Sequence, residues 1–483
     1  MPGVVVTTGV RTGPTGVVVA PSSTWFAAGT AQRGPTAKAQ LVTSLSDFET
    51  YYGTYDASFT LHQQVKTYFE EGGARAYVAR ATGASATAGT LVLQATGPTP
   101  GLTITAANAG AWSSGITVAV VAGAVSGFAV QINYGGVLVY ATGDCANITT
   151  AVNKINSSAV ATVYVTATAI VPSAVLLVAA AVSVSAGAAG SAPTATMLVT
   201  ALSLFTSALG AGAVSIVDQF GATIYAGLIT HAVTNSRIAI LSFDPSATST
   251  AAITTAGTYS TTVGSEGASF YFPHVQVPGP SSTTLTISPD GYVAAKRSIA
   301  HNSYGAWQAG AGLISQANHV TGLASSVDKA TGDLLDAGRI NAIRIIQGSV
   351  RIYGARSASS DEDNYRYITY RDTLNYIVVE AERLLEDLVF STIDGRRTIF
   401  GRVEARLIGL LDPIRTAGGL YAAFDADGTQ IDPGYSVEVS DAINPVAQLA
   451  TGLVKAKCGV RVSGIGDRLE ISVVKSNLTS SVV

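Results

Sequence analysis

The sequence predicts a chain of several modules, with α/β and α+β parts and one β-rich module between them. The chain has 483 residues, which is about three times the length of a common domain. Apolar residues make up 47% of it and charged residues only 12%, so the chain buries enough surface to fold. Residues 81–200 hold two charged side chains, whereas 35 of the 59 in the chain lie from Arg339 onward. A change this sharp indicates modules with different surfaces.

Residues 21–80 and 201–338 have the pattern of an α/β module. A strand is predicted at 24–30, helices at 44–52 and 61–69, and another strand at 75–80. Gly72 and Gly73 end the second helix. Two further strands of the buried type are predicted at 214–217 and 238–243. The interval of about 20 residues between them fits a crossover connection, which favours a parallel pair.

The uncharged block of residues 81–200 is predicted to be β-rich. Its strand candidates are separated by Gly and Ser at intervals typical of a sandwich or an open barrel. They are residues 91–93, 102–105, 116–121, 128–132, 137–140 and 160–165. One short helix is predicted from Asn147 to Asn156. The long uncharged run from Ile155 to Val217 is interrupted by Pro172 and by Ser, Thr and Gly, so short strands are predicted rather than a membrane span.

The block from residue 339 to 483 is predicted to be α+β. Leu and Ile recur with helical spacing over residues 374–388 and again over 398–411. Charged side chains occupy the other faces of both predicted helices. Residues 469–473 alternate between apolar and polar side chains, as in a strand with one buried face.

The sequence offers no constellation that would carry catalysis or bind a metal. The net charge is −3, which does not suggest a nucleic-acid partner, and two cysteines are too few for a disulfide scaffold or a zinc site. Gly264–Gly267 lacks the spacing of a serine nucleophile turn, and no phosphate-binding glycine loop is present. His274 and His301 have no acidic or thiol residue at ligand spacing, so both are interpreted as histidines with ordinary structural partners.

Nine segments, taken in order along the chain, form a recognisable series. They are residues 2–6, 24–35, 43–53, the helix, Gly-Gly and strand of 68–80, the Ser-Pro-Asp-Gly-Tyr run of 288–294, 305–307, 340–344, 350–356 and the Arg-Tyr…Arg-Asp run of 366–372. Together they resemble the contractile-tail sheath proteins of myophages, with Tyr353 at a position where tryptophan is common in that family. The block from 81 to 200 matches no segment of the family.

The resemblance implies a sheath core with a β-rich inserted domain and extended terminal strands. Residues 1–20 would be an N-terminal arm, 21–80 and 201–338 the middle domain, 81–200 an outward-facing insert, and 339–483 an inner domain that ends in an exchange strand. It also implies a structural protein without catalytic activity or cofactor.

By the same resemblance, the chain would assemble with copies of itself into six-fold rings, stacked helically around a tail tube protein. The baseplate and tail terminator proteins would be its other partners, with no direct nucleic-acid binding and no membrane insertion. Contraction would drive the tube through the host envelope for genome ejection. The chain would be found in the virion tail, and in the host cytoplasm during assembly.

The two ends of the chain have the character of exchangeable strands. Val4, Val5 and Val6 are β-prone and are followed by a glycine-rich stretch, and Leu469, Ile471 and Val473 form the alternating apolar face near the other end. A strand donated to a neighbouring subunit makes main-chain hydrogen bonds worth about 0.5–1.5 kcal/mol each. The residues alone are equally compatible with edge strands of the same subunit, and the resemblance favours exchange.

Charged residues in the last block are candidates for subunit interfaces that rearrange. Exposed ion pairs are worth only about 0–1 kcal/mol and exchange partners easily. The alternative for each residue is a solvated helix face. The candidates are Arg396, Arg397, Glu404, Arg406 and Arg415.

Two further readings remain open from the sequence. One is the sheath of a contractile bacteriocin or injection system. The other belongs to a different class, an α/β enzyme or a surface-binding protein with a β-rich insert. An enzyme would need convergent polar residues in a pocket, which the motifs do not supply.

Overall fold

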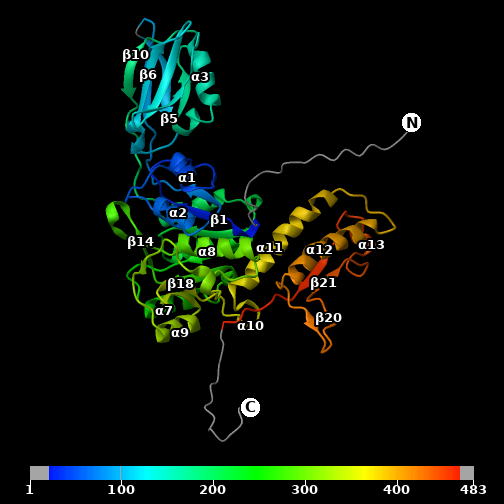
Figure 1. Ribbon diagram of the computed structural model, residues 1–483. Coiled ribbons are helices and arrows are strands. Elements are labelled where there is room, and N and C mark those ends of the chain that lie inside the picture. Colours follow the sequence, from blue (N-terminus) through cyan, green and yellow to red (C-terminus); the bar gives the residue numbers. More distant parts are fainter. Residues whose placement is uncertain (1–20, 98, 468–483) are drawn as a thin grey trace, which may run out of the picture.

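The computed structural model describes residues 21–97 and 99–467. Three parts can be followed in Figure 1: a central body (residues 21–81 and 195–360), an insert above it (residues 90–183), and a C-terminal unit at its side (residues 361–467). Two crossing segments, residues 82–89 and 184–194, form the neck between body and insert. The N-terminal arm of residues 1–20 lies outside the described residues.

The body is built on one eight-stranded sheet. Six strands from β3 to β17 are parallel, and the edge strands β2 and β18 are antiparallel to their neighbours. The predicted parallel pair is confirmed, since Ala213 of β11 lies opposite Ile238 of β12. In spatial order the strands are β18 (Ser349–Tyr353), β17 (Ile340–Ile346), β13 (Ala268–Phe272), β12 (Arg237–Leu241), β11 (Gly212–Ile216), β1 (Trp25–Gly29), β3 (Ala76–Arg80) and β2 (Gln40–Val42).

Helices cover both faces of this sheet because successive side chains of each strand point to opposite faces. Trp25 and Ala27 face the layer of α1 (Leu45–Tyr52), α2 (Leu61–Glu70) and α8 (Asp290–Ser303). Phe26 and Ala28 face the other layer. That second layer contains α5 (Ala195–Ala201), α6 (Ala222–Thr234), α7 (Ser249–Tyr259) and α9 (Lys329–Ala337). The remaining strands of the body are β14 (Val275–Pro278), β15 (Thr284–Ile287) and β16 (Gly322–Leu323).

The insert is a sandwich of two antiparallel sheets, as the strand pattern predicts. One sheet is β10 (Ala179–Ser183), β6 (Ile116–Ala122), β7 (Phe128–Tyr134) and β8 (Val137–Ala141), and the other is β4 (Thr90–Ala95), β5 (Thr99–Ala106) and β9 (Val165–Ala169). Helix α3 (Ile148–Ser157) begins at Asn147, whose side chain accepts a hydrogen bond from the Thr150 amide.

One strand prediction in the insert is wrong. Residues 161–164 form the short helix α4 (Ala161–Tyr164), and β9 starts only at Val165. The Ser158 hydroxyl accepts a hydrogen bond from the Ala161 amide at 3.1 Å, and Ala161 is fully buried. A local cap and a buried contact therefore outweigh the β propensity of Val160 and Val163.

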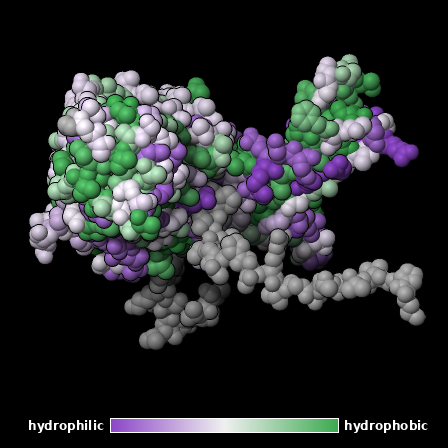
Figure 2. Space-filling model, turned by 90° about the horizontal axis from the view of Figure 1, so that it is seen from above, coloured by the Kyte–Doolittle hydropathy of each residue, from purple (hydrophilic) through white to green (hydrophobic). Residues whose placement is uncertain are grey.

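The C-terminal unit consists of helices packed on short hairpins. Its helices are α10 (Glu362–Tyr365), α11 (Ile368–Leu385), α12 (Thr398–Thr416) and α13 (Val446–Leu449), and its strands are β19 (Ala423–Phe424), β20 (Gln430–Asp432), β21 (Tyr435–Glu438) and β22 (Lys457–Val460). Figure 2 shows hydrophilic residues gathered on this side of the molecule. The rise in charge at residue 339 predicts a boundary there, but β17 and β18 belong to the body sheet and carry charges on its edge.

Candidate functional site at the start of helix α11

The start of α11 is fixed to the edge of the body sheet by a buried polar network. Asn341 of β17 donates hydrogen bonds from Nδ2 to Ser269 Oγ (2.7 Å) and to the carbonyl of Arg356 (3.0 Å), while its Oδ1 accepts from the Arg356 amide (2.6 Å). A Cβ on Gly354 would lie 2.8 Å from Asn341 Oδ1. The Gly354-Ala355-Arg356 run therefore allows the chain to pass this close to Asn341.

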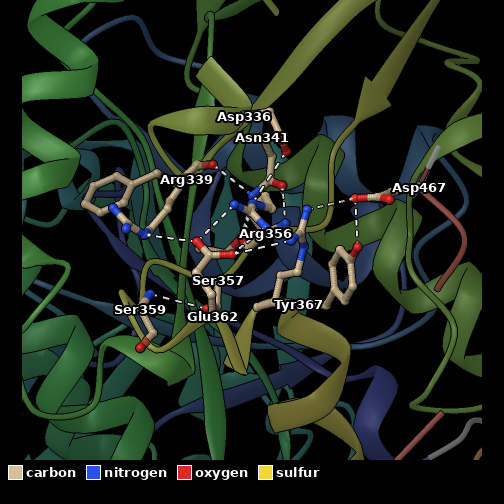
Figure 3. Close-up of polar contacts among 12 residues, drawn as sticks. Asp336, Arg339, Asn341, Arg356, Ser357, Ser359, Glu362, Tyr367 and Asp467 are labelled. Atoms are coloured by element: carbon tan, nitrogen blue, oxygen red, sulfur yellow. Dashed lines mark hydrogen bonds and ion pairs between the residues drawn. The ribbon is translucent and has the colours of Figure 1, made fainter. Parts of the chain in front are cut away.

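An ion cluster surrounds Arg356, as Figure 3 shows. Its guanidinium contacts the Glu362 carboxylate at 3.0 Å through both Nη atoms, and its Nε lies 3.5 Å from Asp336. Arg339 also approaches Glu362, at 3.4 Å. The Glu362 carboxylate thus joins the body strands to the segment leading into α11.

The last described residue, Asp467, is held at the same place. The Tyr367 hydroxyl donates to Asp467 Oδ2 at 2.7 Å, and Arg366 Nη2 lies 3.6 Å from the same oxygen. The Arg366 guanidinium also stacks over the Tyr367 ring, 5.4 Å from its centroid. Asp467 thus approaches the chain at the residues that immediately precede α11 (Figure 3).

The other end of the described chain is held one turn further along α11. Arg297 of α8 pairs with Asp372 through Nε (3.1 Å) and Nη2, and its Nη1 donates to the carbonyl of Ser22 at 2.7 Å. His301 Nδ1 lies 3.0 Å from the Ser22 hydroxyl, and His301 Nε2 lies 3.5 Å from Asp372. His301 therefore has the structural partners that the sequence interpretation expected, although one of them is an acid.

The charges in this second network are buried and mutually dependent. Burial raises the pKa of Asp372, but the charges of Arg297 and His301 outweigh this effect and hold the pKa below its usual range. Burial, and then the charge of Arg297, lower the pKa of His301. Asp372 is thus an ionised acceptor between two basic side chains from α8.

The Arg-Tyr…Arg-Asp run therefore has a physical role. Tyr367 contacts Asp467 and Asp372 binds the arginine that holds Ser22, so both ends of the described chain meet the first turns of one helix. The two positions are five residues apart, or about 7.5 Å along a helix axis. We call Ser22, Arg297, Tyr367, Asp372 and Asp467 the anchor site.

Most of the predicted interface charges pair within the C-terminal unit. Arg397 contacts Asp441, Arg406 contacts Asp387 and donates to the carbonyl of Leu384 (2.6 Å), and Arg415 contacts Asp412 (2.9 Å) and Gln430 (2.6 Å). Arg396 is exposed and Glu404 is half-buried, and neither has an ion pair with another described residue. Their place at a subunit interface stays a prediction.

The six predicted exchange residues cannot be placed. Val4, Val5 and Val6, like Leu469, Ile471 and Val473, lie outside the described residues. Sequence reasoning also missed Arg297, Asp372 and Asp467 as partners. The sequence held a signal for Asp372 alone, which lies in the 366–372 run of the family resemblance. Arg297 and Asp467 lie outside that run, and the interacting residues are 75 to 275 positions apart in the chain.

Within residues 21–97 and 99–467, no group of three or more His, Cys, Asp and Glu side chains is arranged to hold a metal ion. No helix of that part of the chain combines the length and apolar character needed to cross a bilayer.

Comparison with known proteins identifies the fold. No protein-family model and no curated protein matches the sequence. A sheath tail protein from Listeria innocua superposes with a TM-score of 0.61 at 13% identity, over 87% of this chain and 89% of that chain. One from Desulfitobacterium hafniense gives 0.56 at 13%, over 90% and 93%.

A chain from the contracted sheath complex of an extracellular contractile injection system gives a TM-score of 0.55 at 15% identity, over 98% of this chain and 99% of that chain. The chain thus has the fold of contractile sheath proteins. The resemblance seen in the sequence motifs is confirmed for the fold, and the similar chains are structural proteins rather than enzymes.

Proposed function

We propose that this chain is the subunit of a contractile sheath. The observation that carries the proposal is the extent of the structural match, which takes in almost the whole of this chain and of the sheath chain from the injection system. A match limited to the α/β body would be weaker support, because that architecture hosts many functions.

The assembled form we propose is a helical stack of six-fold rings around a tail tube. The baseplate would trigger contraction, a terminator protein would cap the stack, and the contracting sheath would drive the tube through the host envelope. The energy would be stored in the extended lattice, so the subunit would need no cofactor. In a phage, the sheath would assemble in the host cytoplasm and remain in the virion tail.

The subunits of this lattice would be linked by strand exchange. Val4 to Val6 of one copy would pair with Leu469, Ile471 and Val473 of a neighbour. The anchor site supports this proposal because it fixes Ser22 and Asp467, the points where the described chain begins and ends, against the same helix. Force on either terminal segment would then reach the rigid body through α8 and α11.

Exposed ion pairs on the C-terminal unit fit a surface that changes partners. The Arg397 and Asp441 side chains are 44% and 56% exposed, so their pairing contributes little to the fold. Exchange of such pairs between copies during contraction would cost little free energy. Arg396 and Glu404 would add contacts of the same kind.

Deletion of residues 1–12 tests the strand exchange. The shortened chain is expected to fold, with an unchanged circular dichroism spectrum, and to form no tubes in negative-stain micrographs. The full chain, purified in the same way, is expected to form striated tubes or rings. Tubes of the shortened chain would show that the N-terminal segment is not needed for assembly.

Replacing Tyr367 with phenylalanine tests the anchor at Asp467. The loss of one hydrogen bond to a carboxylate at this half-exposed site is expected to cost about 1 kcal/mol. We expect the concentration at which tubes form, measured by sedimentation, to rise about fivefold with little change in melting temperature. The matched control is Tyr370→Phe, whose hydroxyl has no hydrogen bond within the described residues. Equal assembly by both variants would contradict the role of Tyr367.

Simple experiments distinguish the alternative functions of the chain. Particles of a phage tail would carry DNA when isolated with their heads, whereas those of an injection system or bacteriocin would not. A monomer in micrographs of the full chain would instead favour the enzyme or surface-binding reading.

A further inference from the structure

Arg33 of the body extends into a cage of aromatic side chains from the insert. Its guanidinium carbon lies 4.6 Å from the ring centroid of Tyr134, 4.9 Å from that of Tyr164 and 5.4 Å from that of Trp112. These rings come from the end of β7, from α4, and from a short 3-10 helix (Ala111–Gly115). The cage therefore joins three elements of the insert to one side chain of the body.

The rest of the Arg33 side chain is held by the body. Its Nη2 donates to the carbonyls of Glu49 (3.1 Å) and Thr50 (2.9 Å) at the end of α1. Its Nε and Nη1 are buried and have no hydrogen-bond acceptor within the described residues. Because these N–H groups lie among three ring faces, the π electrons are their remaining source of electrostatic stabilisation.

A second arginine fixes the loop that carries Arg33. The buried guanidinium of Arg80 donates to the carbonyls of Ala31 (3.0 Å) and Gly34 (3.2 Å), which flank Arg33 in the sequence. It also donates to the carbonyl of Ala109 in the insert (3.0 Å). Gly110 next to Ala109 has a φ of +138°, and a Cβ there would lie 2.9 Å from the carbonyl of Gln32. The backbones of body and insert thus meet in direct contact beside the cage.

The neck itself has little to keep the insert in place. Its two segments pair through Thr87 and Ala188, and the Ser191 amide donates to the carbonyl of Ala84 at 3.2 Å. Glycines lie where they touch, and Cβ atoms on Gly83 or Gly187 would overlap the opposite backbone. A two-stranded ribbon of this kind bends readily, and Figure 1 shows the insert standing on it above the body.

We propose that Arg33, seated in the cage of Trp112, Tyr134 and Tyr164, is a latch that fixes the orientation of the insert on the body. Body and insert then move as one rigid unit. Without the cation in the cage, the hydrogen bond from Arg80 to the Ala109 carbonyl remains, but the neck bends more freely. The latch acts within one subunit, so it is independent of the proposed sheath function.

The test is a distance distribution between two spin labels on the full chain. Val125 of the insert and Val263 of the body are both 92% exposed and accept labelled cysteines, in a background where the exposed Cys458 is replaced by serine. The distribution is expected to be narrow in this parent and at least twice as broad in Arg33→Met. Arg33→Lys keeps a cation in the cage and is expected to lie between the two.

Two further variants keep the test decisive. Tyr134→Leu removes a ring from the insert side and is expected to broaden the distribution even where Arg33→Met fails to fold. Arg344→Met is the matched control, since Arg344 stacks on Tyr353 within the body sheet, 5.5 Å from its centroid. A distribution that stays narrow in both cage variants, or is already broad in the parent, would overturn the latch.

Discussion

Replacing Asp372 with alanine is expected to lower the free energy of unfolding of the subunit by about 3–5 kcal/mol. The substitution leaves the Arg297 guanidinium, whose side chain is only 9% exposed, without its counter-charge. His301 loses its acidic neighbour as well. Urea unfolding, followed by tryptophan fluorescence and circular dichroism, measures the effect.

The control for this prediction is an aspartate in an exposed ion pair. Asp333 contacts Lys329 at 2.9 Å, with side chains 61% and 83% exposed, so Asp333→Ala is expected to change the stability by no more than about 0.5 kcal/mol. The double variant Arg297→Met, Asp372→Leu removes both charges and is expected to recover much of the lost stability. Equal effects of the two alanine variants would contradict the buried pair at Asp372.

The substitution Asp372→Ala is also expected to affect assembly. The guanidinium of Arg297 both pairs with Asp372 and donates to the carbonyl of Ser22, so loss of Asp372 is expected to loosen the contact with Ser22. At temperatures where Asp372→Ala remains folded, we therefore expect fewer tubes than from the parent at equal concentration. This links the stability of α11 to the end of the N-terminal arm.

The periodic elements of the fold are predictable from the sequence because their signals are local. The helix from Leu45 to Tyr52 begins after Ser44, whose hydroxyl accepts from the Asp47 amide, and the parallel strands β11 and β12 are mostly apolar and buried along their whole length. The strand predicted at Val160 failed for a local reason too, the cap at Ser158. In each case neighbours in the sequence decide the outcome.

The anchor site is not predictable in this way, since its partners meet only in the folded chain. Arg297 and Asp372 are 75 residues apart, and Arg297 and Ser22 are 275 apart. The aromatic cage around Arg33 is likewise not predicted by any pattern in the sequence. The family resemblance pointed to the 366–372 run without saying what it contacts, and the structure supplies the contacts.

A second large effect is expected at a pair of carboxylates at the carboxyl edge of the parallel sheet, of which Asp290 is buried and Asp218 is half-buried. Asp218 follows β11 and Asp290 begins α8. The Ser288 amide donates to Asp218 Oδ1 at 2.7 Å, and the Ser288 hydroxyl donates to Asp290 Oδ2 at 2.6 Å. Burial, with a contribution from the charge of Asp218, raises the pKa of Asp290 to about 7, although hydrogen bonds from Ser288 and Ser242 oppose the shift. Burial also raises the pKa of Asp218.

The sign of the pH dependence follows from this shift. An unfolded Asp has a pKa of about 3.9, so between about pH 4 and pH 7 the native state holds a proton that the unfolded state releases. The contribution of Asp290 to stability is therefore fully present below pH 4 and is lost as the pH rises to about 7. Because the pKa of Asp290 rises from about 3.9 in the unfolded chain to about 7 in the native state, the loss is at most about 4 kcal/mol.

The variant Asp290→Asn isolates this effect because an amide resembles the protonated acid and does not titrate. Burial lowers the pKa of His274 and His301, and these histidines make the wild-type stability change in the opposite direction, but they are shared by both proteins. The difference in melting temperature between Asp290→Asn and wild type is therefore expected to grow from pH 4 to pH 7 and to stay constant above it.

Asp244 provides a control of opposite sign close to the same edge. It is exposed, and hydrogen bonds from Ser246 lower its pKa, so the stability that Asp244 contributes is present above its unfolded pKa and lost in acid. Asp244→Asn is therefore expected to be less stable than wild type at pH 7 and equal to it near pH 3. If Asp290→Asn followed that pattern, Asp290 would be ionised in the native protein at neutral pH. The carboxylate pair would then have to be stabilised by the hydrogen bonds that it accepts from Ser288, Ser242, Gln64 and the Asp218 amide.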